Sequence, residues 1–129
     1  MYYKRIVQKA LHQIWSMDTS TDNVFYENSS RQSSLISRLI YDIFGGDILK
    51  THLKKGWHFY NRINGERVDF SVPETNKTST EISFEDIPCS KAEANNYYIE
   101  EDYSNLFVKF IRVFEEVVGL KRQRFTTAS

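Results

Sequence analysis

The chain of 129 residues has little cysteine, proline or glycine, and its 17 basic and 17 acidic side chains cancel. Because Cys89 is the lone thiol, neither an intrachain disulfide nor a zinc site of paired thiolates can form. A net charge of zero provides no field that attracts a polyanion, so we expect no nucleic acid and no anionic membrane as partner. No stretch approaches the roughly 20 apolar residues that span a bilayer, and the N-terminus does not resemble a signal peptide. We therefore expect a soluble, cytoplasmic protein.

The length suits a single domain over residues 1–129, with residues 120–129 as a flexible tail. Such a chain buries roughly two-thirds of its unfolded surface without needing a disulfide or a structural metal. His12 and His52 have no partner at the spacing of metal ligands, so we expect neither a metal nor another cofactor.

Apolar residues recur at helical spacing in three segments, from Tyr3 to Trp15, from about residue 32 to 44 and from about residue 102 to 118. Glycines follow the second and third segments, at 45–46 and at 119, where a left-handed C-cap has no steric cost. Residues 16–30 are polar and favour a loop, with Ser29 or Ser30 as the N-cap of the second helix.

The middle of the chain predicts a small antiparallel sheet. Residues 48–53 alternate weakly, and two aromatic and β-branched runs at 57–63 and 66–72 flank Asn64-Gly65, the pair preferred in a type I′ hairpin turn. Residues 73–96 are polar apart from a possible short strand at 82–84. The predicted fold class is α+β, with N-terminal helices and a C-terminal helix packed on the sheet.

The hairpin register brings a histidine and an aspartate together. With a two-residue loop, Asn61 pairs with Val68, and side-chain alternation puts His58 and Asp69 on one sheet face. As diagonal neighbours they lie about 7 Å apart at the backbone, a gap that an imidazole and a carboxylate can bridge. The carboxylate would then orient the imidazole, as the third member of a catalytic triad does. A slip of one residue would move His58 to the opposite face.

The start of the second helix is the natural position for a nucleophile, since its free N–H groups stabilise negative charge. Residues 30–72 resemble the YunG-like family of small bacterial proteins, in which Gly-Gln-Cys opens a helix that runs into Asp-x-Phe-Gly-Gly. A Gly-x-His-x-x-Asn-x-Ile-x-Gly hairpin and an Asp follow in the family. The matching residues in this chain are Gln32, Ser33, Asp42–Gly46, Gly56–Ile63, Gly65 and Asp69.

The family order of Cys, His and Asp is similar to that of papain-like and transglutaminase-like cysteine enzymes. The resemblance implies a cysteine-peptidase-like core in which a thiolate attacks an amide or ester carbonyl. It also implies that His58 acts as the base, Asp69 orients it and Gln32 donates to the oxyanion. The implied partner is a peptide, a protein or a small acyl substrate.

The chain departs from the family pattern at the nucleophile. Ser33 stands where the family has Cys, Arg31 where it has Gly, and Glu74-Thr75 where a Gln-Phe pair is expected. A serine hydroxyl is far less acidic than a thiol, so a site tuned for a thiolate loses most of its nucleophile. Three explanations of the serine are open: an engineered Cys→Ser exchange, a natural degenerate paralogue, or a true serine enzyme. Cys89 is no substitute, because it follows the histidine in chain order, in a polar loop.

Each site residue also has a plain structural interpretation. Ser33 can be a helix-start residue, His58 a half-buried sheet histidine, and Asp69 the partner of Arg62 or Arg67 in an exposed ion pair. Asn61 falls on the opposite face from His58 and is expected to be structural.

Two hypotheses follow from these residues. The first is a degenerate cysteine-hydrolase or acyl-transfer site formed by Gln32, Ser33, His58 and Asp69. The second is a non-catalytic module that binds a protein or peptide on the same scaffold.

Overall fold

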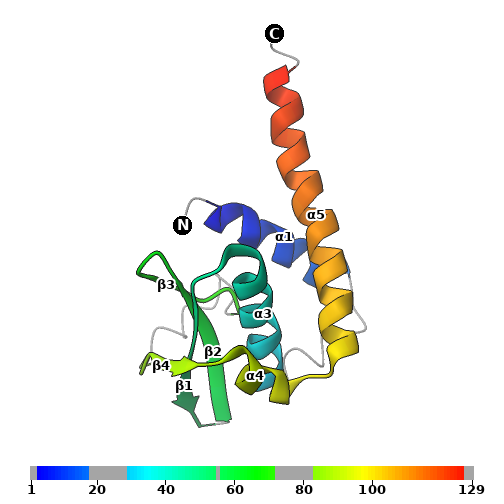
Figure 1. The fold of residues 1–129 in the computed structure, drawn as a ribbon. Helices are drawn as coiled ribbons and strands as arrows, with labels where there is room; N and C mark the ends of the chain where they lie inside the picture. The colour runs from blue at the N-terminus through cyan, green and yellow to red at the C-terminus, as the bar shows by residue number, and fades with distance from the viewer. Residues whose placement is uncertain (1–2, 18–28, 55, 72–82, 127–129) are drawn as a thin grey trace.

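The computed structural model describes residues 3–17, 29–54, 56–71 and 83–126 (Figure 1). They form α1 (Lys4–Met17), α3 (Ser29–Phe44), β1 (Asp47–Leu53), β2 (Gly56–Ile63), β3 (Glu66–Val68), β4 (Ile87–Cys89), α4 (Lys91–Ala94), the 3₁₀ turn η2 (Asn95–Tyr97) and α5 (Glu100–Thr126). The strands make one antiparallel sheet in the order β3-β2-β1-β4. This confirms the predicted α+β class. Within the described ranges, no helix is long and apolar enough to cross a membrane.

The Asn-Gly turn sets the register of β2 and β3. Asn64 has φ of 52° and Gly65 of 80°, and a type I′ turn requires positive φ at both positions. Asn61 pairs with Val68 and Ile63 with Glu66, as predicted. Because β3 ends at Val68, it pairs only with the last three residues of β2.

Helix α3 lies against β2 and beside α5 (Figure 1). Its predicted apolar stripe is buried and consists of Leu35, Ile36, Leu39 and Ile40. The helix ends as predicted at a glycine, because Gly45 has φ of 79° and donates its N–H to the carbonyl of Tyr41 at 3.0 Å.

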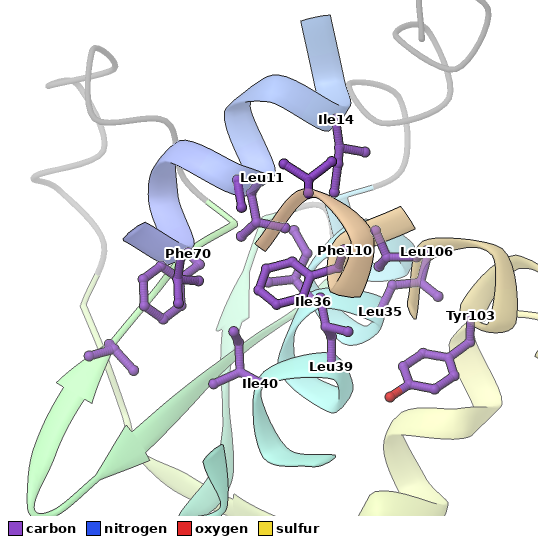
Figure 2. Packing of buried hydrophobic residues seen from close by; sticks show 14 of the residues in the cluster. Leu11, Ile14, Leu35, Ile36, Leu39, Ile40, Phe70, Tyr103, Leu106 and Phe110 are labelled. Atoms are coloured by element: carbon purple, nitrogen blue, oxygen red, sulfur yellow. The ribbon is translucent and has the colours of Figure 1, made fainter. Parts of the chain in front are cut away.

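The main core joins α1, α3 and α5. Figure 2 shows Phe110 of α5 among Leu11 and Ile14 of α1 and Ile36 of α3, and Phe110 is fully buried. Phe70, just after β3, belongs to the same cluster. The core therefore packs against one side of α3, while the first turn of this helix contacts the sheet.

Several predicted boundaries are wrong. Helix α3 begins at Ser29, so Ser29 and Ser30 belong to its first turn rather than capping a helix that starts later. Residues 83–84 form no strand; the fourth strand lies at β4 instead, so Cys89 is in a strand and not in a loop. Helix α5 passes through Gly119 and reaches Thr126, because a glycine alone does not end a helix. Most of the predicted loop at 16–30 lies outside the described residues, as do 127–129 of the predicted tail.

Candidate functional site

The first turn of α3 takes the place of a strand along the edge of β2. Residues two apart in a strand present their backbone N–H groups to the same edge, so Phe59 faces the side on which β3 pairs with Asn61. There the Ser33 hydroxyl accepts a hydrogen bond of 3.1 Å from the N–H of Phe59. One turn earlier, the Ser30 hydroxyl donates to the carbonyl of Trp57. Two serines of α3 thus satisfy backbone groups of β2 beyond the end of β3.

The contact between His58 and Asp69 expected from the register is present. Nε2 of His58 lies 2.6 Å from Oδ2 of Asp69, and the His58 residue is only 4% exposed. The other carboxylate oxygen of Asp69 accepts the N–H of Ser71 at 3.1 Å and the Ser71 hydroxyl at 2.6 Å. Since both oxygens of the carboxylate have donors, its orientation toward the imidazole is held from two sides.

Ser33 meets the backbone directly after His58. Its hydroxyl is buried, accepts from the N–H of Phe59 and donates to the carbonyl of Ser30 over a long 3.3 Å. Among the described residues, the hydroxyl makes no hydrogen bond to the imidazole. Gln32 lies on the same turn of α3 and is half-buried. Ser33 is therefore adjacent to the peptide of His58, with its proton directed elsewhere.

The surface ion pair proposed for Asp69 is wrong, because both arginines have other partners. Arg62 contacts Asp47 at 3.2 Å, and Arg67 contacts Asp86 at 2.6 Å. His58 is buried rather than half-buried. Because both arginines pair with other carboxylates, Asp69 contacts the His58 imidazole and Ser71 instead.

Asn61 has the structural role that was predicted. It is 1% exposed, and its side-chain amide donates to the carbonyl of Ser37 at 2.9 Å. This contact fixes β2 to the second turn of α3, beside the turn that bears Ser33.

A short segment, Ser83–Asp86, covers the sheet next to His58. Thr51, which pairs with His58 across β1 and β2, donates to the carbonyl of Ser83 at 2.9 Å and accepts the N–H of Glu85 at 3.0 Å. The sequence indicated only a possible strand at 82–84 and did not predict this contact, because no local pattern links the segment to a strand more than 30 residues away.

Asp86 fastens the end of that segment to Tyr60. The Tyr60 hydroxyl donates a hydrogen bond of 2.8 Å to the Asp86 carboxylate and accepts one of 2.7 Å from the backbone N–H of Asp86. Burial, together with the Asp86 carboxylate, raises the pKa of Tyr60, so the phenol stays a donor. The Arg67 guanidinium, and then the Tyr60 hydroxyl, hold the pKa of Asp86 below its usual value. Because the rings of Tyr60 and His58 are stacked 6.1 Å apart, this network also borders the imidazole.

Cys89 is separated from these groups, and its thiol is also unreactive. Burial, and then the charge of Glu93, raise the pKa of its thiol to about 12, so it is a poor nucleophile near neutral pH. In the described part of the chain, no group of three or more His, Cys, Asp or Glu side chains is arranged to hold a metal ion.

The described residues define an α+β protein in which a buried histidine, paired with a half-buried aspartate, lies beside the N-terminal end of a helix. Residues 4–115 match the model of the YunG protein family, and this chain belongs to that family. It is 36% identical over 106 residues to the uncharacterized protein YunG of Bacillus subtilis (strain 168), covering 82% of this chain and 90% of that protein. No solved structure matches the chain.

Proposed function

We propose that this chain holds a site of cysteine-hydrolase or acyl-transfer type, within a papain-like or transglutaminase-like core, in which a serine has replaced the nucleophilic cysteine. The observation that supports the proposal is the contact of 2.6 Å between the buried His58 and the half-buried Asp69, directly beside the backbone group that binds Ser33. The fold alone would not support it, since a fold does not determine a reaction.

In this proposal each group has a chemical role. Asp69 contacts Nε2 of His58, so the proton on that nitrogen points at the carboxylate and Nδ1 is left to act as the base. A thiol at position 33 would transfer its proton to Nδ1, and the thiolate would attack an amide or ester carbonyl. The acyl group would pass to sulfur as the C–N or C–O bond breaks and the amine or alcohol leaves with the proton from Nδ1. Water or a second amine, losing a proton to Nδ1, would then release the acyl group and regenerate the thiol.

Ser33 itself is a poor nucleophile in this arrangement. A serine needs its proton drawn toward the imidazole, whereas this hydroxyl donates to the carbonyl of Ser30 and accepts from Phe59. The same bonds favour the second candidate function, a non-catalytic module that keeps the scaffold to bind a protein or peptide.

Restoring the thiol distinguishes the two functions. In a Cys89→Ala background, Ser33→Cys gives a single thiol, whose iodoacetamide labelling rate and thiolate absorbance are measured against pH. For the catalytic site we expect labelling at pH 6 to be about tenfold faster than that of an ordinary thiol and to fall when His58→Ala is added.

The matched control is Ser34→Cys. Ser34 lies on the same turn of α3 and is equally buried, but its hydroxyl bonds to the carbonyl of Arg31. Labelling of Ser33→Cys that equals this control, or that is indifferent to His58→Ala, would overturn the catalytic proposal and leave the binding module.

A further inference from the structure

We infer that the backbone N–H of Phe59 is a further donor of this site, one that holds the reacting atom at position 33 and stabilises negative charge on it independently of His58. The inference rests on the proposed function, because it concerns the same nucleophile. It adds a group from the strand edge to the histidine and aspartate already described.

The N–H of Phe59 has no strand carbonyl as acceptor because β3 is short. A strand continuing past Val68 would supply a carbonyl to Phe59, and its absence from this edge leaves a buried N–H that needs an acceptor. The acceptor is the Ser33 hydroxyl, at 3.1 Å. Any atom that replaces this oxygen at the same position faces the same donor.

The donor is also held rigidly. Phe59 is fully buried and pairs with Lys50 of β1 on the other side of β2. Its ring packs on Tyr97 with centroids 5.0 Å apart, in a cluster with Ile48 and Ala94. A fixed, water-excluded N–H stabilises a developing anion more than a mobile one, because it need not reorient when the charge appears.

Ser30 provides the opposite case, one turn earlier on the same helix and at the same strand edge. Its hydroxyl donates to the carbonyl of Trp57. The oxygen of that carbonyl is the negative end of a dipole and therefore disfavours a negative charge at position 30. Both positions share the N-terminal end of α3, so the helix dipole contributes at each of them. Position 30 lies nearer the helix end and is less buried than position 33, so the dipole and desolvation both favour the thiolate at position 30. A more acidic thiol at position 33 therefore reports the strand group.

The test compares Ser33→Cys with Ser30→Cys, both in a Cys89→Ala, His58→Ala background that removes the imidazole. Thiolate absorbance is followed against pH, since this signal does not depend on how easily a reagent reaches the thiol. We expect Ser33→Cys to have an acid dissociation constant at least about tenfold larger than Ser30→Cys. Equal constants, or the reverse order, would overturn the inference.

A second measurement uses the chain without any thiol. Amide hydrogen exchange at Phe59 should be slow in the unaltered chain and accelerate at least about tenfold in Ser33→Ala, while the amide of Asn61, beside β3, is unchanged. If a thiol variant does not fold, this exchange decides: unchanged protection of Phe59 would overturn the inference.

The two proposals fail separately. If His58→Ala leaves the labelling of Ser33→Cys unchanged, the catalytic site is wrong, whatever the order of the two thiols. If the labelling depends on His58 but the two thiols titrate together, the site stands and the Phe59 donor is wrong.

Discussion

The side-chain amide of Asn61 donates a hydrogen bond of 2.9 Å to the carbonyl of Ser37, and both residues are 1% exposed. This bond ties the central strand β2 to α3 one turn after Ser33. The candidate site therefore depends on a contact that contains none of its chemical groups.

Asn61→Ala should destabilise the fold by about 2 kcal/mol, because it removes the hydrogen bond and leaves space in a buried interface. Denaturant unfolding measures the change. Asn105→Ala, at an exposed position of α5, is the control and should change stability by less than about 0.5 kcal/mol. Similar losses for both variants would contradict a fastening role for Asn61.

Two neighbouring glycines should respond differently to alanine. A Cβ on Gly46 would lie 2.3 Å from the carbonyl oxygen of Arg62, whereas a Cβ on Gly45 would meet nothing within 4 Å. Both have positive φ, so each substitution costs about 1 kcal/mol of backbone strain. Gly46→Ala must also push the β2 backbone away and should cost at least about 3 kcal/mol, measured by thermal unfolding. Equal losses of stability in the two variants would show that the backbone of β2 shifts to accommodate the added Cβ.

Acid should weaken the anchor at Asp86. The folded pKa of this carboxyl is lowered by Arg67 and Tyr60, so its contribution is present above the unfolded pKa of about 4 and is lost as the pH falls through the folded value. Asp86→Asn should thus reduce stability at pH 7 by about 1 kcal/mol or less, since the pair with Arg67 is partly exposed. The unaltered chain and the variant should converge once the pH is below the folded pKa of Asp86. A gap that persists in acid would mean that packing, not charge, is lost in the variant.

The natural thiol should be slow to react. With a pKa raised to about 12, Cys89 should be labelled by iodoacetamide at pH 8 much more slowly than an ordinary cysteine. Glu93→Gln removes the nearby carboxylate charge and should accelerate the labelling. Fast reaction of the unaltered chain would contradict the raised pKa of this thiol.

The local patterns predicted a large part of the fold. Helical spacing of apolar residues located α1, α3 and most of α5, and Asn64-Gly65 located the hairpin and its register. These features depend on residues within a few positions of each other, where periodicity and turn chemistry act directly. The contact of His58 with Asp69 followed from that register, because the two residues share one hairpin.

Contacts between distant segments were beyond prediction from the sequence. The segment Ser83–Asp86, the strand β4 and the partner of Tyr60 are fixed by bonds to residues more than 25 positions away, and no periodicity encodes them. The roles expected for Gln32 and Ser33 in catalysis stay predictions.

The sequence by itself determined which segments are amphipathic, where the chain turns, and that a histidine and an aspartate face the same side of a hairpin. Only the tertiary structure decided where β3 ends and which backbone N–H the first turn of α3 meets. The physical reason is that side-chain patterning is a local property, whereas the partner of an unpaired strand edge depends on how whole elements pack together.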